Sequence, residues 1–477
     1  MLKTKFICTL GPATDDETVL RDLMKTGMNV ARINFSHGTC ADHLKRIEPF
    51  KRVRAEFPFP VALMLDTKGP EIRVRSFENG RAELIAGREF TLRTDEKPGN
   101  ADSVGVTYDK LARDIPVGST VLIDDGLIEL KVERIVCGDV VCRVVNGGTV
   151  SNNKSINIPN ADIKLPYISD RDRQDILFGI ENGFDFIAAS FVSESRDVEE
   201  LRELLAQNNG KHINIIAKIE NQAGVDNIDE IIAASDGIMV ARGDMGVEIP
   251  FENIPSIQKL LVKKCYSAGK RVIVATQMLD SMIRNPRPTR AEITDVANAV
   301  YDGASALMLS GETAVGKYPA ESLRTMVRIA TKTESSIHYK KRFDENKFPM
   351  RNVTDAISHA TCTTAHDLNA AAIITVTKSG HTARMVSKFR PNCPIISAAI
   401  DETVWRQLAL SWGVCPIMAE VKTSTDELFD HVVSLAVEKG LICHGDLVVI
   451  TGGMPLGISG TTNILKVEIV GVNGTGV

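Results

Sequence analysis

The chain has 477 residues and a formal net charge of −5, from 56 lysines and arginines against 61 aspartates and glutamates. This balance gives no electrostatic reason to expect nucleic acid or an anionic membrane surface as a partner. Hydrophobic residues make up 43% and charged residues 25%, which is typical of a globular protein and excludes a disordered or fibrous chain. The length allows about three domains of ~150 residues each.

No signal for export or metal-thiolate chemistry stands out. The first apolar run is broken by Gly11 and Pro12 and followed by acidic residues, so we expect no signal peptide. No run of ~18 apolar residues predicts a membrane span. The nine cysteines are scattered, without a C-x-x-C pair, and the nine histidines have no zinc spacing. These features predict reduced thiols and a cytoplasmic location.

Short apolar runs alternate with amphipathic stretches over much of the chain, which predicts a parallel α/β sheet. Three runs precede residue 70, and five more follow residue 165. They occupy residues 6–10, 28–35, 60–65, 184–191, 213–220, 237–244, 271–278 and 304–311. Eight parallel strands, each followed by a helix, close a TIM (β/α)8 barrel, predicted over 1–69 and 166–340. An open doubly wound sheet is the second possibility, but no glycine-rich dinucleotide fingerprint follows the first strand.

Two further units complete the predicted organisation. Residues 70–165 contain short alternating pieces rich in Val, Ile and Thr, separated by Gly, Asp and Asn turns, which predicts an inserted all-β barrel domain. A polar, basic stretch near residue 340 leads into residues 341–477, a smaller α/β unit. Within the barrel, Thr289 and Glu292 form a capping-box pattern that starts a helix. Its predicted buried stripe consists of Ile293, Val296, Ala297 and Val300.

Polar residues end the barrel runs, and in a TIM barrel these carboxyl ends carry the active site. They are Arg32, Asn34, Ser36, His37, Asp66, Thr67, Lys68, Ser190, Lys218, Glu220, Arg242, Gly243, Asp244, Thr276, Gln277, Ser310, Gly311 and Glu312. Glu220 and Asp244 follow neighbouring strands, so they can share a divalent cation beside Lys218. Ordinary strand-end salt bridges are the alternative interpretation.

This inventory favours phosphoryl transfer. It offers carboxylates for hard cations and basic side chains for phosphate oxygens, without a Ser-His-Asp or Cys-His set. Phosphoryl transfer needs mainly positioning and charge neutralisation. The stretch 311–318 matches G-x-x-x-x-G-K but continues with Tyr318 and Pro319 and follows the last barrel strand, so we do not interpret it as a Walker A loop.

Several long motifs together resemble the pyruvate kinase family from end to end. They lie at residues 5–14, 27–38, 65–73, 215–231, 239–250, 274–282 and 288–319. The resemblance implies an Mg²⁺- and K⁺-dependent transfer from phosphoenolpyruvate to ADP, with allosteric activation. The β insertion would be the family's lid, and the C-terminal unit its effector domain.

The resemblance also assigns roles to residues of the barrel. Glu220 and Asp244 would bind Mg²⁺, and Lys218 would stabilise the moving phosphoryl group. Thr276 would bind substrate and help relay a proton, while Arg32 would hold phosphate. The amides near Gly243 and Asp244 would hold the substrate carboxylate at a helix N-terminus.

Nucleotide and K⁺ sites follow from the same resemblance. Asn34, His37, Arg73 and Lys154 match positions that hold phosphate or nucleotide. The K⁺ ligands would be Asn34, Ser36, Asp66 and the Thr67 carbonyl. Glu71 matches potassium-dependent members, since members that dispense with potassium usually carry lysine there.

In the C-terminal unit, residues 375–382 predict a strand, a tight turn and a helix start that can bind phosphate, with a plain helix N-cap as the alternative interpretation. The resemblance implies that this loop is the family's effector site. Its residues are Thr377, Ser379, Gly380 and Thr382. Met454 and Leu456 stand where some fructose-bisphosphate-regulated relatives have Trp and Arg, which disfavours fructose bisphosphate relative to AMP or a sugar monophosphate, although the identity of the effector stays open among the three. The resemblance also implies a homotetramer.

Two other functions fit parts of the sequence. A metal-dependent barrel lyase or aldolase acting on pyruvate-like acids would also use Glu220, Asp244 and an arginine, but would not need a β lid with Arg73 and Lys154. A metabolite-binding protein on an inactive barrel would lack Lys218, Thr276 or a metal carboxylate, and all are present.

Overall fold

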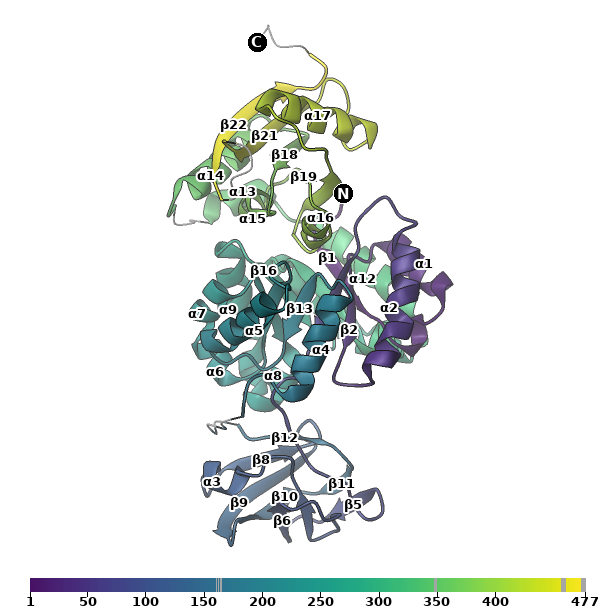
Figure 1. Ribbon diagram of the computed structural model, residues 1–477, viewed down its shortest axis with the longest axis vertical. Coiled ribbons are helices and arrows are strands. Elements are labelled where there is room, and N and C mark those ends of the chain that lie inside the picture. Colours follow the sequence, from purple (N-terminus) through teal and green to yellow (C-terminus); the bar gives the residue numbers. More distant parts are fainter. Residues whose placement is uncertain (160, 162, 164, 347–349, 456–459, 473–477) are drawn as a thin grey trace.

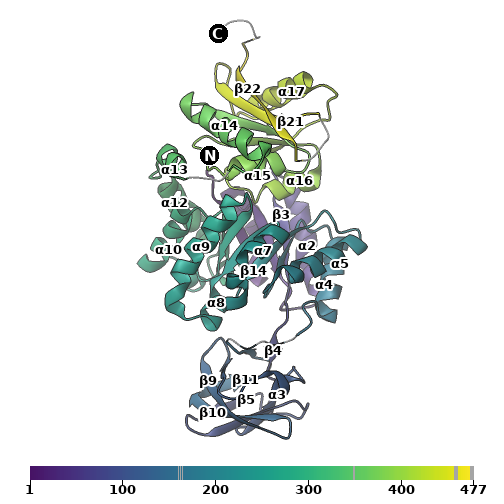
Figure 2. The same ribbon diagram turned by 90° about the vertical axis from the view of Figure 1, so that its left-hand side faces the viewer.

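The computed structural model describes residues 1–159, 161, 163, 165–346, 350–455 and 460–472. They form three units stacked along the long axis of the molecule, with the barrel between the other two (Figure 1). The β insertion lies at one end of the barrel and the C-terminal unit at the other, as a second view confirms (Figure 2).

The central unit is a closed barrel of eight parallel strands in the order β1-β17-β16-β15-β14-β13-β3-β2. The TIM barrel prediction is therefore confirmed, and the open sheet is excluded. All eight predicted apolar runs form its strands. These are β1 (Lys5–Thr9), β2 (Val30–Asn34), β3 (Ala62–Asp66), β13 (Phe186–Ala189), β14 (Asn214–Ile219), β15 (Gly237–Ala241), β16 (Arg271–Ala275) and β17 (Ala306–Leu309).

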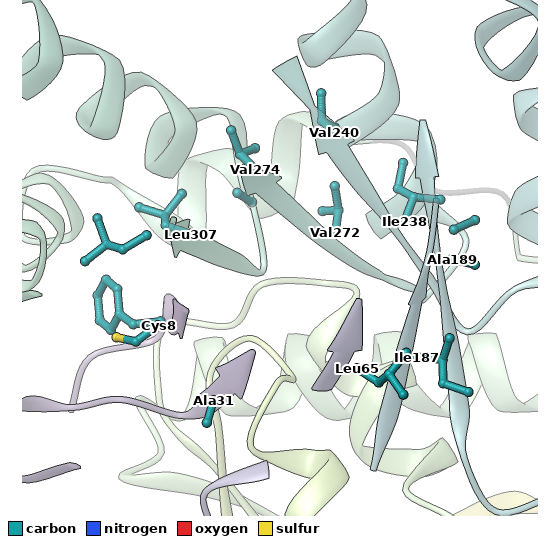
Figure 3. Packing of buried hydrophobic residues seen from close by; sticks show 14 of the residues in the cluster. Cys8, Ala31, Leu65, Ile187, Ala189, Ile238, Val240, Val272, Val274 and Leu307 are labelled. Carbon is teal, nitrogen blue, oxygen red and sulfur yellow. The ribbon is translucent and has the colours of Figure 1, made fainter. Parts of the chain in front are cut away.

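Helices surround the barrel because alternate strand side chains point outward and need apolar cover. Leu65, Ile187, Val240 and Val272 belong to this outer layer (Figure 3). The helices are α1 (Glu17–Thr26), α2 (Cys40–Arg54), α4 (Asp170–Glu181), α5 (Ser195–Gln207), α6 (Gln222–Asp226), α7 (Ile228–Ala234), α8 (Arg242–Glu248), α9 (Ile254–Ser267), α10 (Arg290–Asp302), α11 (Gly311–Ala314) and α12 (Pro319–Glu334). Short 3₁₀ turns occupy Pro12–Thr14, Phe251–Asn253 and Asp280–Ile283.

Helix α10 confirms the capping box but corrects the predicted stripe. The Thr289 side chain accepts from the Glu292 amide, and Glu292 bonds back to the Thr289 amide. Val296 and Val300 are buried, whereas Ile293 is 40% exposed and Ala297 is only partly buried. Ala299 takes the predicted buried place, because the helix turns a face toward the barrel that is shifted from the one the apolar spacing indicated.

The β insertion contains a seven-stranded sheet, in the order β4-β12-β8-β9-β10-β6-β7, and a two-stranded sheet, β11-β5. An antiparallel bridge between Val74 and Val106 joins the two edge strands of the larger sheet, so it curls into the predicted small barrel. One helical turn, α3 (Leu111–Asp114), interrupts the otherwise all-β unit. The strands are β4 (Ile72–Arg73), β5 (Arg81–Leu84), β6 (Glu89–Arg93), β7 (Ser103–Gly105), β8 (Thr120–Ile123), β9 (Ile128–Val136), β10 (Asp139–Asn146), β11 (Gly148–Ser151) and β12 (Ser155–Asn157).

The C-terminal unit is an α/β sheet in the order β20-β19-β18-β21-β22, parallel except for β22. Its strands are β18 (Ala372–Val376), β19 (Ile395–Ala399), β20 (Val414–Met418), β21 (Leu447–Gly453) and β22 (Thr462–Ile469). Its helices are α14 (Val353–Asp367), α15 (His381–Ser387), α16 (Glu402–Leu408) and α17 (Thr425–Glu438). Helix α13 (Tyr339–Glu345) spans the predicted change of domain at residue 340, and its Phe343 packs in the C-terminal core.

Among the residues with described positions, no helix combines the length and apolarity that a membrane crossing requires. All nine cysteine thiols are free.

Candidate active site

A buried network of charges lies at the carboxyl ends of the barrel strands. Asp66, the last residue of β3, accepts from Arg32 Nε at 2.7 Å and from Lys218 Nζ at 3.1 Å. All three residues are less than 10% exposed. Burial opposes ionisation of Asp66, but the two cations outweigh it and hold the pKa of this carboxyl below its usual value.

Lys218 is the centre of this network. Its Nζ also lies 2.9 Å from Glu220 Oε1 and donates to Ser190 Oγ at 2.7 Å. Burial alone would lower the pKa of the ammonium group, but nearby carboxylates outweigh burial and raise it above its ordinary value. These are the carboxylates of Asp66, Glu220 and Asp244. Lys218 is therefore a fixed positive charge.

Ser190 belongs to none of the predicted catalytic or ligand sets, although it is among the polar residues predicted to end the barrel strands. Its Oγ donates to the Thr67 carbonyl at 2.7 Å and accepts from Lys218, and its amide donates to Thr67 Oγ1 at 3.0 Å. It thus joins the ends of β3, β13 and β14. Its inward position, two residues after Ala188 on the same strand face, is the signal that could have identified it.

Glu220 is fully buried and only partly satisfied. Its Oε2 accepts from the Phe191 amide at 2.6 Å, whereas Oε1 faces Lys218 without a hydrogen bond to any described residue. Burial, reinforced by the charge of Asp244 and opposed by Lys218, raises the pKa of Glu220 to about 8. A buried carboxylate oxygen without a hydrogen bond fits a cation ligand.

Thr276 and Gly243 are brought together from neighbouring strands. The Gly243 amide donates to Thr276 Oγ1 at 2.8 Å, and this hydroxyl donates to the Ala275 carbonyl at 2.6 Å. Thr276 and Gln277 both have left-handed backbones, with φ of +67° and +53°. Such strain in non-glycine residues persists only where surrounding contacts enforce it.

Arg242 supplies those contacts. Its guanidinium donates to the carbonyls of Ala275 at 3.2 Å and Thr276 at 2.6 Å, and pairs with Asp295 at 2.7 Å. Arg242 therefore shapes the turn that presents Thr276. Asp244 lies in the first turn of α8, which begins at Arg242, so the predicted helix start is present.

The predicted K⁺ ligands lie together at the ends of β2 and β3. Asn34 and Asp66 are direct partners in the strand register, and the Ser36 amide donates to Asn34 Oδ1 at 3.0 Å. Thr67 is buried next to them. The donors are all oxygen atoms, which fits a hard cation. His37 is exposed in the following turn.

Arg73 and Lys154 lie in the β insertion. Arg73 pairs with Glu71 at 2.7 Å, and Lys154 pairs with Asp124 at 2.8 Å. The Val74 amide donates to the Lys154 carbonyl, so Lys154, which immediately precedes β12, lies beside β4 with its Arg73. These ion pairs lie within the insertion, whereas Asn34 and His37 belong to the barrel, so the predicted nucleotide set is divided between the two units.

The predicted effector loop has the expected strand, turn and helix. Gly380, with φ of +75°, precedes α15, and Arg384 donates to the Ser379 carbonyl at 3.0 Å. Thr377 is buried, and Thr382 shares a hydrogen bond with Thr462 of 2.8 Å. Met454 bonds to Asn463 through its backbone. Leu456, the second position at which this chain differs from the fructose-bisphosphate-regulated relatives, lies outside the described residues.

Two other strand-end features are structural. Glu312 accepts from the amides of Leu279 at 3.0 Å and Ser310 at 2.7 Å, which occupies both of its oxygens. The Walker-like stretch 311–318 forms α11 and the turn before α12. This segment therefore does not form a phosphate-binding loop after a first strand.

A cavity of about 1070 Å³ lies between the β insertion and the barrel. Its described walls include six carboxylates: Glu71, Glu194, Asp197, Glu200, Asp226 and Glu248. None of the described lining residues belongs to the predicted catalytic, nucleotide or metal sets. An acidic wall repels anionic substrates, so we place the chemistry at the Lys218 network instead.

The donor atoms present decide whether the site fits a divalent cation. In the described part of the chain, no cluster of three or more His, Cys, Asp or Glu forms a ready-made metal cage. The carboxylates of Glu220 and Asp244 still fit Mg²⁺, because Glu220 Oε1 accepts no hydrogen bond from a described residue. Mg²⁺ usually takes one or two protein carboxylates and completes its coordination with water and substrate oxygens.

The fold and the site together define a (β/α)8 barrel enzyme with buried basic groups and carboxylates at the carboxyl ends of its strands. Family models match in the same order: "Pyruvate kinase, barrel domain" over residues 1–323 and "Pyruvate kinase, alpha/beta domain" over residues 355–468. The chain belongs to the pyruvate kinase family.

Relatives along the whole chain agree. The chain is 51% identical to a pyruvate kinase of Clostridium acetobutylicum, covering 98% of this chain and 100% of that protein. It is 50% identical to a pyruvate kinase of Sporosarcina psychrophila, covering 99% of this chain and 81% of that protein. A crystal structure of a pyruvate kinase from Cryptosporidium parvum superposes with a TM-score of 0.92 at 40% identity, covering 98% of this chain and 96% of that one.

Proposed function

We propose that this chain transfers the phosphoryl group of phosphoenolpyruvate to ADP, giving pyruvate and ATP, the last step of glycolysis. The observation that carries the proposal is the buried network of Arg32, Asp66 and Lys218 beside the half-satisfied Glu220. It combines fixed positive charge with cation ligands, which phosphoryl transfer requires. Membership of the pyruvate kinase family supports the same reaction.

Lys218 would stabilise the charge that moves during the reaction. Its ammonium group keeps its proton because three carboxylates surround it, so it can face the transferred phosphoryl group and the negative oxygen left on the enol fragment. Arg32 would hold a phosphate oxygen with the donors that Asp66 and Thr9 leave free.

Thr276 would help deliver the proton that turns the enol fragment into pyruvate. The Gly243 amide and the strained turn held by Arg242 fix its hydroxyl. In the reaction, the enolate oxygen forms a carbonyl with its carbon, the carbon–carbon double bond becomes single, and its electron pair takes a proton at the methylene carbon to give the methyl group of pyruvate. The amides near Gly243 and Asp244 would hold the carboxylate of the substrate.

Two cations complete the proposed site. Mg²⁺ held by Glu220 and Asp244 would supply charge that neutralises phosphate and carboxylate oxygens, and K⁺ held by the Asn34, Ser36, Asp66 and Thr67 oxygens would add to it. Asn34, His37, Arg73 and Lys154 would bind ADP. Because Arg73 and Lys154 lie in the β insertion, we propose that this unit moves toward the barrel as a lid.

The remaining proposals concern regulation and assembly. A phosphorylated effector would bind at Thr377, Ser379, Gly380 and Thr382 and activate the enzyme. The protein would act as a cytoplasmic homotetramer, without nucleic acid or membrane partners.

The decisive experiment measures pyruvate formed from phosphoenolpyruvate with ADP, Mg²⁺ and K⁺ present, and again with each omitted in turn. We expect turnover only with ADP and Mg²⁺, and strong stimulation by K⁺. Pyruvate formed equally well without ADP would contradict the proposal and favour a lyase. No pyruvate under any condition would contradict both.

A further inference from the structure

Leu410 belongs to the C-terminal unit by sequence but to the barrel by packing. It follows α16 in a short turn, and its side chain is fully buried. It joins an apolar cluster whose other members all come from barrel strands: Ile7, Val30, Ala62, Met64, Phe186, Ala188, Ile216, Met239, Ile273, Ala275, Ala306 and Met308. Figure 2 shows α16 on the side of the C-terminal unit that faces the barrel.

Buried cations of the barrel fix the turn that carries Leu410. Lys5 Nζ donates to the Val414 carbonyl at 2.7 Å. Arg271 donates to the Gln407 carbonyl at 3.1 Å and to Ser411 Oγ at 3.3 Å. Because Lys5 and Arg271 begin β1 and β16, these bonds hold the turn at the amino end of the barrel.

Helix α16 adds contacts to the β3–β13–β14 side. Arg406 Nε pairs with Asp185 Oδ1 at 2.7 Å, and Asp185 Oδ2 accepts from the Leu63 amide at 2.9 Å. Gln407 Nε2 donates to the His212 carbonyl at 2.6 Å. The turn is therefore docked on several strands at once, and Leu410 closes the amino end of the barrel.

The inward-facing side chains of Asp66, Ser190 and Lys218, here called the catalytic layer, lie next to this cluster toward the carboxyl ends of the strands. Side chains two residues apart on a strand share a face. Met64 therefore lies beneath Asp66, Ala188 beneath Ser190, and Ile216 beneath Lys218. Closely packed interiors transmit small shifts, because their side chains have few voids to move into. We therefore expect a change at the amino end of the cluster to shift the side chains that hold the charges.

We propose that Leu410 is a positioning residue for the reaction: the C-terminal unit completes the barrel interior with this side chain, and thereby holds Lys218 and its partners in register. The inference rests on the proposed function, because positioning is expressed as phosphoryl transfer. Leu408, the last residue of α16, lies next to Gly380 of the predicted effector loop, so α16 and the turn after it lie between that loop and the barrel interior.

The test compares Leu410→Ala with a matched variant, Leu428→Ala. Leu428 is a buried leucine of α17 in a cluster formed by C-terminal residues alone. Both variants of the full chain lose a core side chain, so both should melt at lower temperature. At a temperature where both are folded, we expect Leu410→Ala to lower kcat about tenfold, because small misplacements at a reacting centre are costly. Leu428→Ala should keep kcat within about twofold of wild type, since distant core sites act independently.

A conservative variant separates positioning from stability. Leu410→Met nearly conserves volume, so it should return kcat to within about twofold of wild type. If Leu410→Ala does not fold, Leu410→Val, which removes less of the side chain, replaces it, and Leu410→Met remains the conservative control. A wild-type kcat in Leu410→Ala, or in Leu410→Val as its replacement, would overturn the proposal. An equal loss of kcat in Leu428→Ala would overturn it too.

Hydrogen exchange supplies a readout that needs no turnover. The Phe191 and Gly243 amides donate to Glu220 and Thr276 at the carboxyl end of the barrel. We expect both amides to exchange faster in Leu410→Ala, or in Leu410→Val if that variant replaces it, and at the wild-type rate in Leu428→Ala. Unchanged exchange at both amides would overturn the positioning role. If the wild-type chain forms no pyruvate, the proposed reaction fails, while this exchange comparison still decides the role of Leu410.

Discussion

The two ends of the barrel use buried cations in opposite ways. At the carboxyl end, carboxylates surround Lys218 and raise its pKa. At the amino end, Lys5 and Arg271 bond to carbonyls and a hydroxyl, and burial lowers the pKa of both, that of Arg271 to about 9. A cation among carboxylates keeps its charge for use on a substrate. A cation among carbonyls serves to attach one domain to another.

The largest effect should come from removing the cation of the catalytic end. Lys218→Met should lower kcat by at least about 10³-fold, because the charge that faces the transferred group is lost in a site of low dielectric. The control is Lys5→Met at the amino end, where we expect kcat within about threefold of wild type, because Arg271 and Arg406 still hold the turn that carries Leu410. A coupled pyruvate assay and circular dichroism would check both variants. Near-normal turnover in Lys218→Met would break the contrast between the two ends.

The next largest effect concerns the turn at Thr276. Arg242→Ala removes the bonds to the Ala275 and Thr276 carbonyls and should lower kcat about 10²-fold by misplacing the hydroxyl. Thr276→Val should have a similar effect, whereas Thr276→Ser should keep most of the activity because it keeps the hydroxyl. If Arg242→Ala retained wild-type kcat, the strained turn would have no role in presenting Thr276.

Binding of Mg²⁺ should depend on pH through Glu220. The pKa of this carboxyl is raised to about 8, so below that pH the free protein carries a proton that the cation must displace. Affinity for Mg²⁺ should therefore rise as pH increases toward 8 and then level off. Calorimetry in two buffers of different ionisation enthalpy would measure the released proton.

Glu220→Gln provides the control for that measurement, and Glu312→Gln is its match, because Glu312 bonds only to backbone amides. We expect Glu220→Gln to lose the proton release and to weaken Mg²⁺ binding by at least about tenfold. Proton release that persists in Glu220→Gln, or disappears in Glu312→Gln, would assign the titration to another group.

The smallest effect on activity is expected for one cation of the amino end, because the bonds of Lys5 and Arg406 still hold the turn that carries Leu410. Arg271→Met removes two interdomain hydrogen bonds and should lower the free energy of unfolding by about 1–3 kcal/mol, with kcat changed less than about threefold. Denaturant unfolding followed by fluorescence would measure the stability. A loss of activity as large as that of Lys218→Met would show that the two ends do not divide their roles as we describe.

Much of the fold could be read from the sequence, because burial on both faces leaves an unmistakable apolar run in each barrel strand. These runs predict the eight strands, whereas short alternating pieces separated by Gly, Asp and Asn turns predict the β insertion. Ile293 shows the limit: apolar spacing placed it in the core, yet it is 40% exposed. Spacing fixes which residues share a helix face, but the neighbours decide which way that face turns.

The candidate site divides in the same manner. The sequence by itself determined the chemical types at the strand ends, and the motifs carried the roles of Lys218, Glu220 and Thr276. Only the tertiary structure decided that Ser190 joins three strand ends, that Arg242 braces a turn and that Leu410 closes the barrel from another domain. The physical reason is that local periodicity records burial, whereas contacts between residues far apart in the chain exist only once the strands have closed.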